Sequence, residues 1–227
     1  MENRKAVVLL SGGIDSSTTL YLAKRQGLKC FCLIFDYGQR HKREIEAARR
    51  IAEIANCKWQ IAEIGLPWKG SSLLDIKKRI PKHSNIPRFR HSDRIPSTYV
   101  PARNTIFLSF ALSYAEAIGA CAIVIGAHIQ DYSGYPDCRP EYYRAFKKVM
   151  DLGTKEGKGI EILTPLIGKT KAEIIKLGKK LGVPFGLTWS CYRGGKYPCR
   201  VCDSCYYRAK GFKEAGIEDP LMGCRKK

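Results

Sequence analysis

Short apolar runs alternate with longer, helix-like segments along the first half of the chain. The runs 6–10, 30–35 and 121–125 are continuous and apolar, which is typical of strands buried on both faces, and 59–64 is a further candidate. Segments 16–26, 41–56 and 105–118 lie between them and are predicted as helices, the last one apolar nearly all round and therefore buried. This alternation predicts an α/β fold, a Rossmann-like parallel sheet with helices on both faces.

The second half carries clear start and stop signals and a change of composition. Thr170 and Glu173 have the spacing of a capping box, so a helix is expected over 170–181, ending at Gly182 and Pro184. We therefore expect an α/β domain over 1–185 and a small cysteine-rich module over 186–227. Residues 69–98 form a basic, proline-punctuated insertion without periodicity, predicted as either a phosphate-covering lid or a solvated flexible loop.

Composition narrows the class of protein. The 227 residues are 44% hydrophobic and 27% charged, which supplies a core and argues against intrinsic disorder of the whole chain. The five apolar residues 6–10 are too few for a secretion signal, and no run approaches a membrane span, so we expect a cytoplasmic protein without a membrane partner. The net charge of +19 fits RNA, nucleotides or any other polyanion.

A glycine-rich turn between the first predicted strand and helix is the first candidate for chemistry. Ser11-Gly12-Gly13-Ile14-Asp15-Ser16 offers a backbone that approaches an anion closely and N–H groups that point at it. The sequence is neither the dinucleotide nor the Walker motif; it resembles the Ser-Gly-Gly-x-Asp-Ser signature of the PP-loop ATP pyrophosphatases. The predicted ATP loop, with Mg²⁺ as the counter-ion, comprises Leu9, Leu10, Ser11, Gly12, Gly13, Ile14, Asp15, Ser16, Ser17, Thr18 and Thr19.

A second phosphate contact is expected from Lys171, which follows Pro165 in a Pro-Leu-x4-Lys-x-Glu pattern similar to another element of those ATPases. On its position alone, Lys171 is equally well interpreted as a lysine on the solvent-facing side of a helix. The candidate catalytic residues are Ser11, Asp15, Ser16 and Lys171.

Four cysteines near the end of the chain predict a metal site. Cys191, Cys199, Cys202 and Cys205 include two Cys-x2-Cys steps in a polar context that offers no apolar core. Structural Zn²⁺ is the leading prediction; an iron–sulfur cluster is the rival, and disulfides are disfavoured by the expected compartment. The other six cysteines are expected to pack in the core.

Three polar segments complete the candidate site. They follow the second strand, precede the 105–118 helix and follow the 121–125 strand, where open sheets place ligands. Their cations, amides and tyrosines could recognise a flat polar heterocycle that bears a carboxylate: Gln39, Arg40, His41, Arg103, Asn104, Asp131, Tyr132, Tyr135, Asp137 and Arg139.

Together these motifs make a resemblance specific. SGGIDSS, FDYGQRH, YVPARNT, DYSGYPDCR and the four-cysteine run, in this order over 7–220, resemble the QueC family of 7-cyano-7-deazaguanine synthases. Membership implies an adenine nucleotide alpha hydrolase-like fold and a carbon–nitrogen ligase. ATP would activate the carboxylate of 7-carboxy-7-deazaguanine, ammonia would give the amide, and a second ATP would lead to the nitrile. The product would feed queuosine or archaeosine synthesis.

The resemblance also implies one structural Zn²⁺ on the four cysteines, a homodimer, and a substrate pocket formed largely by Asp131, Tyr132, Tyr135, Asp137 and Arg139, with Arg103 and Asn104 nearby. The chain departs from the family pattern in having Arg200 where Gly is usual and Ser17 where Thr is usual. Two other functions compete: a PP-loop enzyme that adenylates a tRNA base, and a zinc-knuckle nucleic-acid-binding protein. Neither explains the 131–139 segment and the ATP loop together, so we do not expect a nucleic-acid partner.

Overall fold

A five-stranded parallel sheet forms the centre of the computed structural model, which describes residues 4–68, 70–83, 95–128 and 135–222. The strands are β1 (Lys5–Leu9), β2 (Lys29–Asp36), β3 (Lys58–Glu63), β4 (Ala122–Val124) and β5 (Glu161–Leu163). They pair in the order β3-β2-β1-β4-β5, every pair parallel. The chain therefore reverses its direction across the sheet between β1 and β4, and a crevice opens at the carboxyl ends of such strands.

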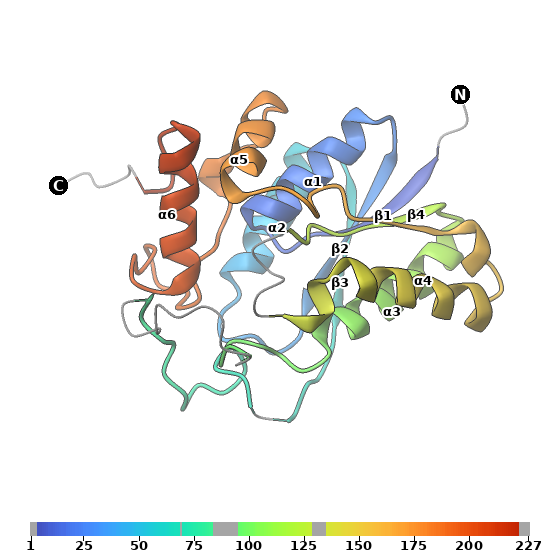
Figure 1. The fold of residues 1–227 in the computed structure, drawn as a ribbon, viewed down its shortest axis with the longest axis horizontal. Helices are drawn as coiled ribbons and strands as arrows, with labels where there is room; N and C mark the ends of the chain where they lie inside the picture. Colours follow the sequence, from blue (N-terminus) through green and yellow to red (C-terminus); the bar gives the residue numbers. More distant parts are fainter. Residues whose placement is uncertain (1–3, 69, 84–94, 129–134, 223–227) are drawn as a thin grey trace.

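Helices cover both faces, which confirms the predicted fold class (Figure 1). On one face α1 (Ile14–Arg25) and α2 (Arg43–Ile54) bury Leu20 and Ile51 against alternate residues of the central strands. On the other face α3 (Arg103–Ile118) and α4 (Pro140–Gly153) bury Leu108 and Phe146 against the remaining strand residues. The central strands β2, β1 and β4 thus face apolar side chains on both sides, which explains their continuous hydrophobic runs, whereas the edge strands β3 and β5 are only partly buried.

Two further helices extend the α1 side of the molecule. α5 (Lys171–Lys180) begins with the predicted capping box: the Thr170 hydroxyl accepts from the Glu173 N–H, and the Glu173 carboxylate accepts from the Thr170 N–H. α6 (Asp203–Ala215) packs on α5 through Phe212 and Ala215, which share an apolar cluster with Ile174 and Ile175. Close packing depends on glycine, because a Cβ on Gly178 would lie 2.5 Å from Phe185 Cζ.

The structure corrects several expectations. The helix predicted at 105–118 is not buried all round: Leu108, Leu112 and Ala115 face the core, whereas Phe110 is 44% exposed. Strand β5 and helices α4 and α6 were not predicted, nor were the 3₁₀ turns Pro136–Cys138, Gly157–Gly159 and Phe185–Leu187. α4 carries buried Tyr143, Phe146 and Met150 at helical spacing, so its pattern was present in the sequence. α6 has a weaker apolar stripe, and β5 begins with the exposed Glu161.

Part of the basic insertion is held firmly against the rest of the chain. Within the insertion, the Ser72 N–H donates to the Ser97 carbonyl at 2.8 Å. His83 joins the insertion to the rest of the chain, because its N–H donates to the Val201 carbonyl at 2.8 Å and its Nδ1 lies 2.6 Å from Asp203 Oδ1 of α6. The His83 ring also stacks on Tyr206, with ring centroids 3.5 Å apart. The remainder of the predicted lid, residues 69 and 84–94, lies outside the described residues.

Of the six cysteines expected in the core, Cys30, Cys32 and Cys138 are buried, Cys57 and Cys121 are half-buried, and Cys224 lies outside the described residues. No helix within the described ranges is long and apolar enough to cross a membrane.

Candidate functional site

The ATP loop is a tight turn that joins β1 to α1, and its shape requires glycine. Gly12 has a φ of +75°, and a Cβ on it would lie 2.5 Å from the Glu44 carbonyl oxygen and 2.6 Å from the Ala48 nitrogen of α2. Only a residue without a side chain fits that contact, and Gly13 then forms the N-cap of α1. The turn therefore leaves the N-terminus of α1 free to present N–H groups to an anion.

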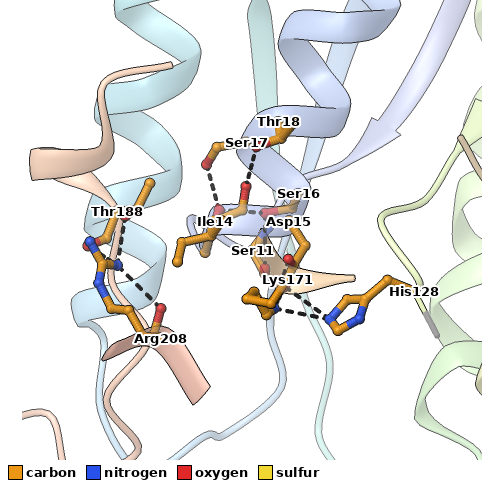
Figure 2. A network of polar contacts seen from close by, with 12 residues as sticks. Ser11, Ile14, Asp15, Ser16, Ser17, Thr18, His128, Lys171, Thr188 and Arg208 are labelled. Carbon is orange, nitrogen blue, oxygen red and sulfur yellow. Dashed lines mark hydrogen bonds and ion pairs between the residues drawn. The ribbon is translucent and has the colours of Figure 1, made fainter. Parts of the chain in front are cut away.

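The hydroxyls of the loop fall into two groups (Figure 2). Ser17 donates to the Gly13 carbonyl at 2.6 Å and Thr18 to the Ile14 carbonyl at 2.8 Å, so these two stabilise the first turn of α1. Ser11 and Ser16 instead bring their Oγ atoms within 3.1 Å of each other at the mouth of the loop. Ser11 is exposed, whereas Ser16 is buried and also donates to the Gly13 carbonyl at 3.4 Å, and Leu9, Leu10 and Thr19 are buried beneath the loop.

Asp15 faces two residues brought from distant parts of the chain. Lys171 Nζ, at the start of α5, lies 2.7 Å from each Asp15 carboxylate oxygen. His128, just after β4, places Nε2 2.9 Å from the same Nζ and 3.6 Å from Asp15 Oδ2 (Figure 2). The structure thus assigns Lys171 to the ATP loop rather than to solvent, since only 11% of its side chain is exposed. The three residues meet at the crevice between β1 and β4.

Charge and close packing both hold this group in place. Burial alone would raise the pKa of the Asp15 carboxyl, but Lys171 and His128 together hold that pKa well below its usual range. Asp15 therefore stays ionised and fixes the ammonium beside the helix N-terminus. α6 supports Lys171 from behind, because a Cβ on Gly211 would lie 2.4 Å from Lys171 Cγ.

A second polar group lies at the carboxyl end of β2. Arg103, from the start of α3, hydrogen-bonds the Tyr37 hydroxyl, and Tyr37 and Gln39 both hydrogen-bond the Glu44 carboxylate. Burial raises the pKa of Glu44 to about 7, although Arg103 partly offsets the effect. Gln39 also closes the turn, accepting from the Tyr37 N–H at 2.8 Å and donating to the Phe35 carbonyl at 3.0 Å. The group offers a guanidinium and a carboxylate to a polar ligand.

The third polar segment is anchored to α3. Asp137 accepts from the Asn104 backbone N–H at 3.1 Å, and the Asn104 side chain donates to the Asp137 carbonyl at the same distance. Tyr135 is joined to Thr98, their hydroxyls 2.8 Å apart. Arg139 is exposed at the N-cap of α4, and Asp131 and Tyr132 lie outside the described residues. Asn104 and Asp137 are therefore in direct contact, whereas the Tyr135 hydroxyl contacts Thr98.

Two of the predicted pocket residues are engaged elsewhere. Arg40 donates through Nη2 to the carbonyls of Asp75, Ile76 and Lys78, so it fastens the basic insertion. His41 packs against the cysteine-rich segment, where a Cβ on Gly194 would lie 2.2 Å from the His41 Cβ. Both residues connect the end of β2 with neighbouring segments.

The four cysteines form one cluster. Cys191, Cys199, Cys202 and Cys205 have their Sγ atoms all within 4.8 Å of one another, and the Cys199 and Cys205 sulfurs are 4.0 Å apart. Four thiolates at the Zn–S distance of about 2.3 Å would be separated by about 3.8 Å, so the cluster fits a tetrahedral zinc ion. The Cys191 pKa is held well below its usual range by hydrogen bonds from the Cys202 and Cys205 thiols, and the Cys199 and Arg193 N–H groups donate to the same sulfur.

Arg200 explains why glycine is usual after the second cysteine. Its φ is +63°, a left-handed conformation that glycine adopts without steric cost. The Arg200 guanidinium donates to the Met222 carbonyl at 3.0 Å, which ties the turn between the cysteines to the C-terminal segment.

Comparison with known proteins agrees with this site. The family model described as queuosine biosynthesis protein QueC matches residues 5–216. The chain belongs to the QueC family. The 7-cyano-7-deazaguanine synthase of Trichormus variabilis is 54% identical over 222 residues, which cover 96% of this chain and 97% of that protein. The synthase of Thermoplasma acidophilum is 52% identical over 97% of this chain and 92% of its own length.

Solved structures resemble this QueC chain in fold alone. NMN synthetase from Francisella tularensis is 15% identical, with a TM-score of 0.50 over 95% of this chain and 88% of that chain. A 4-thiouridine synthetase, solved as an RNA complex with bound ATP, is 19% identical, with a TM-score of 0.50 over 94% of this chain and 50% of that chain. Both support the α/β arrangement around the sheet.

Three residues of the site escaped the sequence-based prediction. His128 sits in an apolar strand end with no motif around it, and Tyr37 and Glu44 look like turn and helix-surface residues. His128 is 3% exposed and Tyr37 is 5% exposed. Position could have indicated Tyr37 and His128, which follow the predicted strand ends at 35 and 125 within three residues, because ligands of open sheets collect there. Glu44 stands farther along the chain, in α2, and had no such signal.

Proposed function

We propose that this chain uses ATP to convert 7-carboxy-7-deazaguanine and ammonia into 7-cyano-7-deazaguanine. The observation that carries the proposal is the similarity to curated synthases over 96% of the chain, which spans both the ATP loop and the four cysteines. The reaction proceeds through an adenylated carboxylate and an adenylated amide. Pyrophosphate leaves when each adenylate forms, and AMP leaves when ammonia adds and again when the nitrile forms by elimination.

The ATP loop suits this chemistry. A carboxylate is a poor electrophile, so its oxygen must first attack the α-phosphorus of ATP and acquire a good leaving group. The N–H groups at the start of α1 and the Lys171 ammonium then stabilise the charge that develops on the phosphates. Asp15 keeps that ammonium in place through the two 2.7 Å contacts with its carboxylate. We infer that Mg²⁺ accompanies the nucleotide and neutralises further phosphate charge.

Arg103 is the residue that we propose for the substrate carboxylate. It lies beside Tyr37, with its guanidinium carbon 5.9 Å from the ring centroid, at the carboxyl edge of the sheet. A guanidinium binds a carboxylate through two parallel hydrogen bonds. Asn104, Tyr135 and Asp137 supply further polar contacts to the heterocycle, together with Asp131, Tyr132 and Arg139.

The cysteine cluster has a structural role in this proposal. The zinc ion would fix the turns 191–205. In the preceding segment, the backbone N–H of Trp189 donates to the Gly12 carbonyl of the ATP loop at 2.8 Å. In this role the metal would stabilise the segment that supports the ATP loop and would not contact the reacting groups. We further propose a homodimer in the cytoplasm, where ATP is supplied, with the nitrile consumed in queuosine or archaeosine synthesis.

Incubation of the purified, zinc-loaded chain with ATP, ammonium and 7-carboxy-7-deazaguanine tests the proposal. The nitrile product is expected by mass spectrometry, together with AMP and pyrophosphate. Asp15→Ala and Ser11→Ala should abolish turnover while the bound zinc, measured by atomic emission, stays unchanged. Pyrophosphate release that depends on tRNA and gives no nitrile would instead support an enzyme that adenylates an RNA base.

A further inference from the structure

Two surface hollows flank the same turn of the cysteine-rich segment. The first, of about 560 Å³, is walled by residues 76–82 of the basic insertion, by Arg40 and by Arg193. The second, of about 240 Å³, is walled by the start of α2, by the 186–189 segment and by residues 196–198. The turn 193–198 contributes to both hollows, because Arg193 lines the first, and Lys196, Tyr197 and Pro198 line the second. We call the surface of the two hollows the basic band.

The walls of the basic band are fixed before any ligand arrives. Arg40 fastens residues 75–78 through three carbonyls, and Lys78 Nζ donates to the Gly70 carbonyl at 2.8 Å. His83, in the middle of the insertion, lies 2.6 Å from Asp203 between Nδ1 and Oδ1. Gly194 presses its backbone against His41, which locks the turn 193–198 onto the end of β2. A preformed surface loses less entropy when it binds a partner.

Positive charge dominates this surface. The described residues that line the first hollow include no acid and five cations: Arg40, Lys78, Arg79, Lys82 and Arg193. The second hollow adds Arg43, Arg50 and Lys196 against the single acid Glu46. Cations gathered without counter-charges repel one another, so an anion bound among them relieves that repulsion. The ATP loop does not account for these residues, since they stand on other segments.

Aromatic rings lie among the cations. Tyr197 is 64% exposed, and Lys196 Nζ lies 5.6 Å from its ring centroid. Trp189 forms the floor of the second hollow beneath Arg43, whose guanidinium carbon is 5.1 Å from the indole. Trp189 is only 8% exposed, so Tyr197 is the ring of these two that is open to solvent. An exposed aromatic face beside a cationic groove is a surface on which an unpaired base stacks while the cations follow the phosphates.

We propose that the basic band binds single-stranded RNA, with Arg79, Lys82 and Arg193 on consecutive phosphates and Tyr197 stacked on a base. An open surface favours a chain that continues past it over a small polyphosphate, which proteins enclose more fully. The net charge of +19 agrees with a polyanionic partner. The proposal replaces the expectation that nucleic acid is no partner of this chain, and it stands independently of the nitrile chemistry.

Fluorescence anisotropy with a labelled single-stranded RNA of about 12 nucleotides tests the inference on the zinc-loaded chain. Binding should weaken steeply as salt rises from about 50 to about 200 mM, because released counter-ions drive association. Arg79→Ala/Lys82→Ala should weaken binding and reduce the slope of log K against log salt by about 1.4, from about 0.7 for each lost phosphate contact. Tyr197→Ala should weaken binding about 5- to 100-fold and leave the slope unchanged.

The matched control is Lys179→Ala/Lys180→Ala, which removes the same charge from exposed positions at the end of α5. Its affinity for RNA should stay close to that of the parent chain. Zinc content and melting temperature, measured for every variant, exclude misfolding as the cause of a loss. The inference is overturned if the parent chain does not bind the RNA, if the control loses as much affinity as the band variant, or if polyglutamate competes as well as RNA and Tyr197→Ala has no effect.

Discussion

Arg208 of α6 is the least exposed charged side chain among the described residues, and its guanidinium nitrogens all donate hydrogen bonds. Its side chain is 1% exposed and that of Asp219 is 6% exposed. Arg208 Nε and Nη2 donate to the two Asp219 oxygens at 2.7 and 2.8 Å, Nη1 donates to the Thr188 hydroxyl at 2.8 Å, and Nη2 also donates to the Phe185 carbonyl at 3.1 Å. One guanidinium therefore ties α6, the 185–189 segment and the C-terminal segment together (Figure 2).

Arg208→Met keeps much of the side-chain volume but leaves the Asp219 carboxylate buried without its cation. Removal of one partner from a buried ion pair costs about 3–5 kcal/mol. For a chain of this size that loss lowers the melting temperature by about 6–20 °C. Activity should suffer as well, because the 185–189 segment carries the Trp189 N–H that holds Gly12 at 2.8 Å. Thermal unfolding followed by circular dichroism measures the effect.

Two further variants make the reasoning refutable. Arg208→Met/Asp219→Leu removes the stranded charge and should recover part of the loss, leaving about 1–3 kcal/mol for the acceptors at Thr188 and Phe185. Lys210→Met, on the same helix, breaks a pair with Glu214 whose side chains are 43% and 48% exposed, and it should cost at most about 0.5 kcal/mol. If Arg208→Met costs no more than Lys210→Met, or if the double variant is less stable than the single one, the ion pair does not hold this region.

Four further outcomes follow from the geometry. His128→Leu removes the ring nitrogen that lies 2.9 Å from Lys171 Nζ and 3.6 Å from Asp15 Oδ2, and it should raise the KM for ATP about tenfold. His128→Gln, which keeps a polar side chain, should lower the KM again, and equal KM values for the two variants in steady-state assays would contradict this. Burial raises the pKa of Glu44 from 4.5 to about 7. Between these two pH values the folded chain holds a proton on Glu44 that the unfolded chain has lost, so the free energy of unfolding falls as the pH rises. Glu44→Gln lacks this proton loss, so its melting temperature relative to that of the parent chain should rise as the pH increases from 5 to 8. A difference in melting temperature that stays constant over this pH range would contradict the prediction. Cys202→Ser should lose bound zinc and lower the melting temperature, and a zinc-free chain that remained folded and active would remove the structural role of the metal. Gly178→Ala places a Cβ 2.5 Å from Phe185 Cζ and 2.7 Å from Thr18 Oγ1, so it should lower the free energy of unfolding by about 1–3 kcal/mol. Gly153→Ala, with nothing within 4 Å of the new Cβ, should not lower it, and similar unfolding curves for the two variants would refute the close-packing argument.

Local patterns predicted what depends on neighbouring residues. The parallel sheet followed from short apolar runs, because a strand buried on both faces has to be apolar throughout. The capping box at Thr170 was legible for the same reason, since both of its hydrogen bonds close within four residues. β5 gave no such signal, because it begins with the exposed Glu161 and its other two residues are only partly buried, and α6 has only a weak apolar stripe. The buried residues of α4 do recur at helical spacing, so that helix was missed although its pattern was present.

The amino-acid sequence by itself determined the chemical inventory: a glycine turn after a strand, a lysine at the start of a helix, four cysteines at metal-binding spacing. It could not determine which of these meet. Lys171 and Asp15 are 156 positions apart, and only the packing of α5 against α1 and α6 brings the ammonium to the carboxylate. Tertiary structure also places Arg40 against residues 75–78, His41 against Gly194 and His128 beside Lys171. The sequence could not show these contacts, because burial and distance are properties of the folded chain.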